Sequence, residues 1–385
     1  MSTERRAEIA GAGFAGLAAA AALAQRGWRV RVHERADAIR TEGAGIYIYE
    51  NGLRVLEALG CCEQAIAGAH IAHTRETRDD QNRILAVHRW DTTASRVYSI
   101  VRQRVIDALA DAARRAGAEI VTGSTATGAT PGGELLLADG RRLSADLVIG
   151  ADGVNSRIRD ALGLLRKRRR LPDGAIRLLI DKTAEERAAG ADGRTVEYWS
   201  GSRRIVFTPC SDRDIYIALT MLNADEVATR VPIDRAEWTR SFPHLTDLIA
   251  RFGTQGHYAP FDWIRLRRWS AGHVAVIGDA AHALPPNIGQ GAGCAMMNAL
   301  SLAVHLAGAA DVSAALAAWE ARERPITEHT QRVSVWLGVP TTWPPAMRNL
   351  TFRLIGKSKW LVRQRIKTAL HRPTGTRNAY PHATE

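Results

Sequence analysis

The sequence predicts an α/β fold with α+β elements: a Rossmann-type dinucleotide-binding domain, an inserted antiparallel-sheet domain and a helical C-terminal segment. Three observations predict it. A glycine-rich turn joins a predicted strand to a helix near the N-terminus, a second glycine-rich segment lies far downstream, and hairpin-like strands lie between them. The order of elements places the dinucleotide-binding domain at residues 1–73, 100–175 and 268–330, the inserted domain at 74–99 and 176–267, and the helical segment at 331–385.

The first glycine-rich segment, Gly11-x-Gly13-x-x-Gly16, has the spacing of a phosphate-binding turn. Gly11 permits the tight turn, Gly13 lets the backbone approach a pyrophosphate, and Gly16 lets helix and strand pack closely. The following helix offers free N–H groups to phosphate oxygens. The turn lies between three predicted elements: a strand at residues 7–10, a helix at 14–25 and a strand at 28–33.

Glu34 ends the second strand, about 20 residues after the turn, and can accept a hydrogen bond from a ribose hydroxyl. Its carboxylate would repel a 2′-phosphate, so NADP is disfavoured here, and NAD or the ADP half of FAD remains. A plain strand–helix turn is the alternative, but strand, helix and acid together favour dinucleotide binding. The residues expected at this end of the cofactor are Gly11, Gly13, Phe14, Ala15, Gly16, Glu34 and Arg35.

The second segment, Gly278-Asp279 followed by Pro286 and Gly289-Gln290-Gly291, adds a carboxylate and a glycine-rich loop late in the chain. A cofactor held by segments so far apart is extended, which favours FAD over a nicotinamide cofactor alone. We identify no covalent-attachment pattern, so we expect non-covalent binding. Between the two segments, Gly150-Ala151-Asp152-Gly153 closes a predicted strand, and Ser156 can cap the helix that follows.

Further elements are predicted along the chain: a helix at 103–116, strands at 119–122, 134–137 and 146–149, a hairpin of 204–209 and 214–220, a strand at 274–277 and a helix at 292–307. The hairpin is predicted because two strand-like segments flank a short polar loop. Residues 343–371 alternate apolar and basic residues at helical spacing, which predicts a helical layer with a basic outer face. Membrane docking of this layer is the alternative.

The chain of 385 residues carries a net charge of +12, although its composition is otherwise ordinary. Part of the surplus lies at residues 166–170 and part at 357–377. Such clusters can bind nucleic acid or an anionic membrane, but no base-stacking aromatic residues interleave with these arginines. We therefore expect a solvated loop, a solvated helix face, no nucleic-acid partner, and a positive field that attracts small anionic substrates.

The apolar N-terminal region resembles a secretion signal in composition, but Glu8 lies where the apolar core of a signal should begin. No apolar run reaches the roughly 18 residues of a membrane span. The cysteines, Cys61, Cys62, Cys210 and Cys294, show neither metal-ligand spacing nor a disulfide framework. These features predict a cytoplasmic protein with reduced cysteines, no metal site and no membrane span.

Three motifs in order, Gly11–Gly16 with Glu34, Gly150–Gly153, and Gly278-Asp279 with the loop through Gly291, resemble those of the single-component flavoprotein aromatic hydroxylases, the p-hydroxybenzoate hydroxylase class. The resemblance covers residues 5 to about 330. Within the class, the sequence is similar to oxygenases of hydroxypyridine carboxylates. The segments that carry this similarity are Arg5-Arg-Ala-Glu8, Gly43-Ala-Gly-Ile-Tyr47, Asn51-Gly-Leu-Arg-Val-Leu-Glu57, Pro209-Cys210 with Tyr216, and Gln290-Gly-Ala-Gly-Cys-Ala-Met296.

The resemblance implies an FAD-dependent monooxygenase that uses O2 and a transient co-substrate, NADH or NADPH. It implies that Asp279 binds the ribityl hydroxyls and that Arg102 contacts the flavin. The other cofactor residues that it implies are Asp152, Gly153, Gly278, Gly289, Gln290, Gly291 and Ala292.

The same resemblance places Arg204, Tyr216, Tyr47 and Pro286 at the substrate and the flavin ring. At Arg75 the sequence departs from the related oxygenases, which carry tyrosine, and we expect Arg75 to assist Arg204. Residues 331–385 do not match the related oxygenases.

The expected chemistry fits these residue types. Oxygenation by O2 needs a redox carrier that side chains do not provide and flavin does. An arginine suits a substrate carboxylate and a tyrosine suits a ring hydroxyl or nitrogen. We therefore expect oxygenation of an anionic hydroxylated aromatic or pyridine carboxylate, with ring opening and simple hydroxylation both open. The alternatives are an FAD-dependent epoxidase or reductase of an apolar substrate, and a basic FAD protein without catalysis.

Two candidate roles have simpler structural alternatives. Arg204 and Tyr216 also suit the satisfied polar face of a strand, although we favour contact with the substrate. His282 suggests a general base, but a histidine beside such a turn is more often structural. The sequence leaves homo-oligomerisation open.

Overall fold

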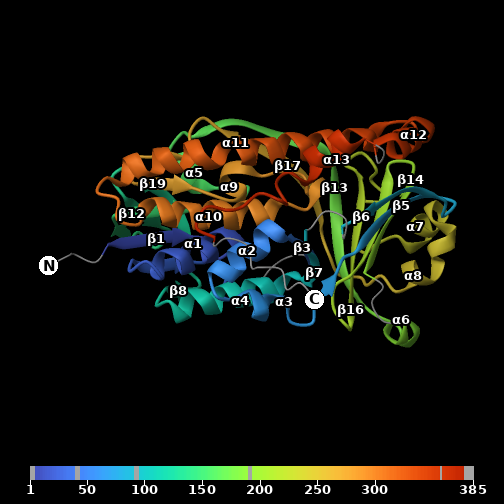
Figure 1. The fold of residues 1–385 in the computed structure, drawn as a ribbon, viewed down its shortest axis with the longest axis horizontal. Helices are drawn as coiled ribbons and strands as arrows, with labels where there is room; N and C mark the ends of the chain where they lie inside the picture. The colour runs from blue at the N-terminus through green and yellow to red at the C-terminus, as the bar shows by residue number, and fades with distance from the viewer. Residues whose placement is uncertain (1–4, 40–43, 91–94, 190–192, 356–357, 377–385) are drawn as a thin grey trace, which may run out of the picture.

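A computed structural model describes residues 5–39, 44–90, 95–189, 193–355 and 358–376. Gly43, Lys357 and Arg377, which bound segments of the sequence analysis, lie outside these ranges. Figure 1 shows an elongated molecule with one group of sheets and helices around β1 and α1 and a second around β13 and β16. The long helix α11 (Val312–Gly338) runs along the molecule and connects the two groups.

The first group is built on a six-stranded sheet. Its strands, in spatial order, are β18 (Ser270–Ala271), β19 (Val274–Val276), β12 (Leu147–Gly150), β1 (Arg6–Ala10), β2 (Arg29–His33) and β8 (Glu119–Val121). All neighbouring pairs are parallel except β18–β19. This arrangement confirms the predicted Rossmann-type core and brings the turns after β1 and β12 together at one sheet edge.

Helices complete this core. Helix α1 (Phe14–Ala24) is buried along its whole length, so its small alanines can pack against α10 (Gly291–Leu306) and α4 (Arg102–Arg115). Smaller elements surround them: α2 (Glu50–Ala58), α3 (Cys62–Ile66), α5 (Arg157–Ala161), α9 (Asp279–His282), the sheet β3 (Gly45–Tyr49), β7 (Val97–Val101), β4 (His70–Ile71), and the sheet β11 (Arg142–Ser144), β10 (Glu134–Leu137), β9 (Ala126–Thr130).

The second group is built on a seven-stranded sheet. Its strands, in spatial order, are β17 (Tyr258–Leu266), β13 (Leu165–Asp181), β16 (Asp214–Leu222), β15 (Arg203–Pro209), β14 (Arg194–Ser200), β5 (Thr74–Asp79) and β6 (Ile84–Arg89). One face packs its isoleucines and leucines against α7 (Arg235–Ser241) and α8 (Thr246–Ala250). The opposite face carries polar side chains and faces the first group. The predicted hairpin is confirmed as β15–β16.

Two expectations about the basic segments need correction. Residues 166–170 are not a loop but part of β13, where pairing with β17 satisfies their backbone while their side chains stay exposed. Arg168 and Arg170 pair there with Asp262. The predicted domain boundaries stay predictions: residue 175 lies within β13 and residue 330 within α11.

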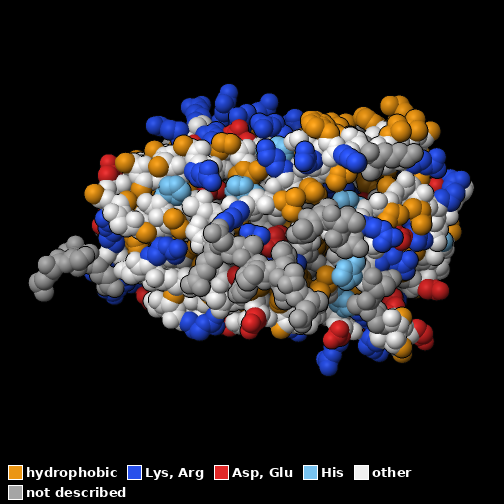
Figure 2. Space-filling model, viewed as in Figure 1, with side chains coloured by type: hydrophobic (Ala, Val, Ile, Leu, Met, Phe, Trp, Pro, Cys, Tyr) orange, Lys and Arg blue, Asp and Glu red, His pale blue; other side chains and the backbone are white. Residues whose placement is uncertain are grey.

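The C-terminal layer contains α12 (Pro345–Ile355) and α13 (Lys359–Ile366), as predicted, but its outer face is not uniformly basic. On α12 the exposed side chains include Met347, Leu350 and Leu354, and hydrophobic side chains gather at this end of the molecule in Figure 2. Arg348 instead points inward and stacks over Trp199 at 5.1 Å. Arg348 and Arg365 are turned inward, whereas Arg353, Lys359 and Arg363 are exposed.

Two observations concern membranes and cysteines. Among the described residues, no helix combines the length and the hydropathy of a membrane span. All four cysteines are buried and unbonded, and the part of the chain that the structure describes contains no cluster of metal-ligating side chains.

Candidate active site

The first glycine-rich turn has the geometry of a close approach by backbone. Gly11 has φ of +101°, and a Cβ there would lie 2.4 Å from the carbonyl oxygen of Ala151. A Cβ at Gly16 would lie 1.9 Å from the Gly11 oxygen, whereas a Cβ at Gly13 would meet no atom within 4 Å. The turn is therefore closed on the protein side and open at Gly13, the position expected to face a phosphate.

The second segment contributes a free carboxylate to the same region. Asp279, at the start of α9, is exposed to a cavity and accepts no hydrogen bond from any residue in the described ranges. Desolvation raises the pKa of Asp279, and Arg102 and Arg177 oppose this effect. Arg102 stacks over the ring of Phe14 at 5.0 Å. An acid without a partner beside two cations can accept hydrogen bonds from ligand hydroxyls.

Three predicted cofactor residues have partners within the protein. The Glu34 carboxylate accepts hydrogen bonds from the backbone N–H groups of Ala12 (2.9 Å) and Ala36 (3.0 Å). One oxygen of Asp152 accepts from the first N–H groups of α5, at 2.8 and 3.3 Å. Gln290 is buried, and its side-chain oxygen accepts from Asn51. Their roles in cofactor binding stay predictions.

A cavity of about 380 Å³, here called the ring cavity, joins the two glycine-rich segments to the seven-stranded sheet. Its lining includes most of the predicted site residues: Gly13, Phe14, Ala15, Tyr47, Arg75, Arg102, Gly153, Arg204, Tyr216, Gly278, Asp279, Pro286, Gly289, Gly291 and Ala292. Arg35 is exposed and does not line it. The cavity thus brings together residues from both ends of the chain.

Strand register explains why Arg204 and Tyr216 face this cavity together. Arg204 lies opposite Thr220, and Tyr216 lies opposite Thr208. Since side chains alternate between sheet faces, these positions on β15 and β16 share one face. The Tyr47 hydroxyl is hydrogen-bonded to Thr208. Burial raises the pKa of Tyr47, so its hydroxyl stays protonated. The Tyr216 hydroxyl has no hydrogen-bond partner among the described residues.

A buried charge cluster forms the far wall of the ring cavity. Arg75 of β5 pairs with Glu197 of β14, and Arg204 approaches the same carboxylate oxygen at 3.5 Å. The Nε of Arg204 donates to Thr220 at 2.9 Å. Burial alone would raise the pKa of Glu197, but Arg75, Arg204 and Arg365 outweigh it and hold that pKa below its usual value. Glu197 is therefore a carboxylate at neutral pH.

Arg365, on α13, adds a third cation to this cluster. Burial and the nearby Arg75 lower its pKa to about 10, so it stays charged at neutral pH. It forms no hydrogen bond or ion pair with any other residue that the structure describes. Three guanidinium groups therefore surround one carboxylate, which leaves a surplus of positive charge at the wall of the cavity.

Sequence reasoning missed Glu197 and Arg365. Glu197 lies between Val196 and Tyr198 in an apolar strand, and an isolated acid in such a strand signals a buried partner. Arg365 has no comparable local signal. His282 lies outside the ring cavity: it contacts Asn298 at 2.9 Å, and burial lowers its pKa to about 4. This placement fits the structural interpretation favoured above.

The residues present fit FAD. Open space at Gly13, Gly153 and Gly291 admits backbone contact with a ligand, and Asp279 offers an unpartnered acceptor. Gly278 has φ of +63°, and a Cβ there would lie 2.8 Å from the Cβ of Ala15. The two glycine-rich segments therefore pack directly on each other and can hold the two ends of one extended cofactor.

Gly45 sets the position of Tyr216. A Cβ at residue 45 would lie 2.6 Å from both Cβ and Cγ of Tyr216, so Gly45→Ala must displace that ring. Because small misplacements at a reacting centre are costly, we expect kcat/KM to fall on the order of 100-fold. The flavin content of Gly45→Ala should stay unchanged. Gly253→Ala is the control and should keep wild-type activity, because an added Cβ at residue 253 would have one atom within 4 Å, at 3.9 Å. Unchanged kcat/KM in Gly45→Ala would contradict a role for Tyr216.

Comparisons with known proteins identify the family of this chain. The family model described as FAD binding domain matches residues 5–334. The solved tetrameric form of 2-methyl-3-hydroxypyridine-5-carboxylic acid oxygenase matches with a TM-score of 0.87 at 37% identity, covering 97% of this chain and 98% of that chain. This match confirms the similarity to hydroxypyridine-carboxylate oxygenases that the sequence indicated, and it extends through the C-terminal segment.

Two bacterial relatives match over nearly the same length. The 2-heptyl-3-hydroxy-4(1H)-quinolone synthase of Mycobacteroides abscessus is 38% identical over 358 residues, which is 92% of this chain and 95% of the relative. A Rhodococcus erythropolis protein assigned the same name is 40% identical over 370 residues, 96% of this chain and 97% of the relative.

Proposed function

The chain belongs to the family of FAD-binding, p-hydroxybenzoate hydroxylase-like flavoproteins and is an FAD-dependent monooxygenase, and we propose that it oxygenates the anionic form of a hydroxylated N-heteroaromatic ring. The overall reaction consumes one ring C–H group, O2, NAD(P)H and a proton, and it yields a C–OH group, water and NAD(P)+. FAD supplies the redox and oxygen chemistry when bound, held without a covalent bond by the two glycine-rich segments and Asp279.

The observation that carries the proposal is the surplus of positive charge beside an unpartnered tyrosine hydroxyl. Arg75, Arg204 and Arg365 surround a single carboxylate, Glu197. In a buried site such a surplus favours binding of an anion. An anionic ring oxygen or a carboxylate would be held at this wall, while Tyr216 hydrogen-bonds the ring hydroxyl or nitrogen. The deprotonated ring is more electron-rich and therefore reacts more readily with electrophilic oxygen.

The protein environment serves the same purpose. Tyr47 is fixed by its hydrogen bond to Thr208, and Tyr216 is held against Gly45, so the two rings can orient a flat substrate. Polar side chains on this sheet face argue against the alternative of an epoxidase or reductase of an apolar isoprenoid. The names of the relatives, which specify a hydroxyquinolone and a hydroxypyridine carboxylate, support an N-heteroaromatic ring. A homo-oligomer is supported by the tetrameric form of the related oxygenase.

The proposal is tested by measuring NADH and NADPH oxidation, together with product formation, against a panel of rings. The panel comprises hydroxypyridine carboxylates, hydroxybenzoates and 4(1H)-quinolones. We expect oxidation coupled to a hydroxylated or ring-opened product for at least one N-heteroaromatic member. A preference for an apolar alkene, or NAD(P)H oxidation that no ring stimulates, would overturn the proposal.

Arg204→Met tests the anion contact within this proposal. Losing one charge-assisted contact removes about 1.5–3 kcal/mol, so KM for the preferred acidic substrate should rise roughly 10- to 150-fold. The kcat should change little if the contact is equally strong in the ground state and the transition state. Arg203→Met is the matched control, because Arg203 points to the opposite sheet face and pairs with Asp225 and Glu237. Equal KM values in both variants would contradict the assignment.

A further inference from the structure

A second cavity, here called the C-terminal cavity, lies between the seven-stranded sheet and the helices α11, α12 and α13. Its volume is about 660 Å³, within the roughly 300–1,000 Å³ typical of small-molecule sites. The strands β5, β6 and β14 form its floor, and the C-terminal helices form its roof. Of the described segments that predict FAD binding, the loop from Pro286 to Gly291 contributes one residue to it, Asn287.

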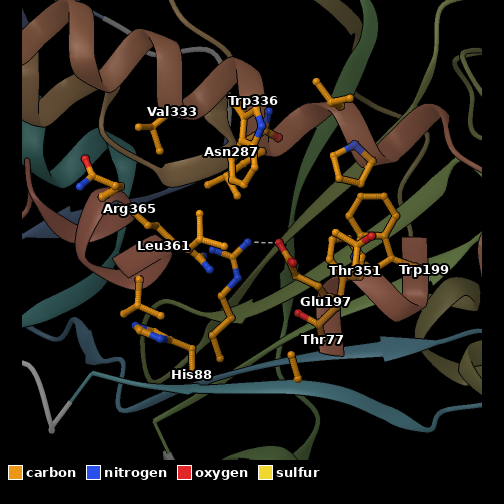
Figure 3. A pocket seen from close by; sticks show the side chains of 18 of the residues that line it. Thr77, His88, Glu197, Trp199, Asn287, Val333, Trp336, Thr351, Leu361 and Arg365 are labelled. Atoms are coloured by element: carbon orange, nitrogen blue, oxygen red, sulfur yellow. Dashed lines mark hydrogen bonds and ion pairs between the residues drawn. The ribbon is translucent and has the colours of Figure 1, made fainter. Parts of the chain in front are cut away.

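The two cavities meet at the charge cluster. Arg75, Glu197 and Arg204 line both of them. Figure 3 shows Arg365 and Glu197 converging in the C-terminal cavity, with the ion pair of Glu197 drawn as a dashed line. The cluster is thus the wall that the two cavities share, and a substituent on a ring in the ring cavity would have to pass it to enter the second cavity.

The walls away from the cluster are mainly apolar. Val333, Trp336, Leu337, Phe352 and Leu361 contribute apolar side chains to them, and His329, Arg332 and Gln364 contribute polar ones. His88 also lines the cavity, but burial, aided by Arg365 and Arg75, lowers its pKa to about 4, so it is uncharged at neutral pH. Glu197 is the single acid among the lining residues. The two cavities together are thus polar and cationic at the ring and apolar beyond it.

We propose that the C-terminal cavity binds an alkyl chain carried by the heteroaromatic substrate. This inference rests on the proposed function and narrows it to a ring with a long apolar substituent, such as a 2-alkyl-4(1H)-quinolone. A pyridine carboxylate fills only the ring cavity and gives the second cavity no occupant. The heptyl group in the names of the two relatives is consistent with this choice.

The test measures binding of 4(1H)-quinolones with hydrogen, methyl, propyl and heptyl at position 2. Dissociation constants are measured for the FAD-loaded enzyme by calorimetry and by quenching of tryptophan fluorescence, so the readout does not depend on turnover. Burying each methylene should tighten binding about threefold, so even if only three of the six additional methylenes are buried, the heptyl compound should bind ~30-fold more tightly than the methyl compound. Equal affinities across the series would overturn the inference.

Val333→Trp fills the C-terminal cavity and therefore tests whether the alkyl chain of the ligand binds there. In this variant we expect the advantage of heptyl over methyl to disappear, while the affinity of the unsubstituted ring is retained. Val335→Trp on the same helix is the control, because Val335 does not line the cavity, and it should keep the wild-type dependence on chain length. If the affinity of Val333→Trp still increases with the length of the alkyl chain, while flavin content and melting temperature are normal, the alkyl chain binds elsewhere.

The two proposals fail separately. If the enzyme oxygenates the unsubstituted quinolone or a pyridine carboxylate but an alkyl chain does not increase the affinity, the inference about the C-terminal cavity is wrong and the proposed function stands. If no ring of the panel is bound or oxygenated, the proposed function itself is wrong.

Discussion

Asp279→Ala should be purified with little or no flavin. The carboxylate faces the ring cavity without a hydrogen-bond partner in the described part of the chain, and we propose that it accepts hydrogen bonds from cofactor hydroxyls. Each lost charge-assisted hydrogen bond should weaken binding by about 1.5–3 kcal/mol, or roughly 10- to 150-fold in Kd. Losing two such bonds to neighbouring ribityl hydroxyls would reduce FAD occupancy below detection after gel filtration.

The measurement is the molar ratio of released FAD to protein after denaturation. Release of the flavin from the wild-type chain also tests non-covalent binding. Asp279→Asn, which keeps an oxygen acceptor, should retain more FAD than Asp279→Ala. Asp262→Ala is a control that removes an acid paired with Arg168 and Arg170, outside the ring cavity, and should retain full occupancy. Stoichiometric FAD in Asp279→Ala would show that the second segment does not hold the cofactor.

Glu197→Gln should strongly destabilise the folded protein. The substitution leaves Arg75 and Arg204 buried without their anionic partner, and breaking such a pair typically costs about 3–5 kcal/mol. Glu186→Gln is the matched control, because its pair with Arg251 is partly exposed and should contribute at most about 1 kcal/mol. Urea denaturation at neutral pH compares the two variants with wild type. Equal stability of Glu197→Gln and wild type would contradict the claim that the buried charge cluster stabilises the folded protein.

The stabilisation that the ion pairs of Glu197 contribute to the folded protein depends on pH. The pKa of Glu197 is lower in the folded protein than in the unfolded chain, so its stabilisation is fully present above the unfolded value of about 4.3. It is lost as pH falls through the folded value. The stability difference between wild type and Glu197→Gln should therefore be constant near neutrality and shrink below about pH 4. A difference that grows on acidification would have the wrong sign.

The parts of the site that the sequence predicted are those with local geometric causes. Gly11, Gly16 and Gly278 are needed where backbone approaches backbone, and these close contacts are present. The hairpin strands also follow from local alternation, and the shared face of Arg204 and Tyr216 follows from their register. Family resemblance then supplied the cofactor and the enzyme class, which composition and spacing alone leave open.

The parts that the sequence did not predict depend on long-range pairing. Glu197 meets Arg75 only because β5 pairs in parallel with β14, and no motif specifies that pairing. Arg365 reaches the cluster from a C-terminal helix that carried no recognisable motif. The basic run at 166–170 was expected in a loop because its charge is high, but pairing with β17 determines its structure. The apolar cavity likewise arises where two segments distant in sequence face each other.

The most direct test of the central claim is mass spectrometry of the product formed under 18O2 with NAD(P)H and the best N-heteroaromatic member of the panel. The account predicts one 18O atom in the ring product and one NAD(P)H consumed per molecule formed. Product oxygen that comes from water, or NAD(P)H oxidation without any oxygenated ring, would contradict it.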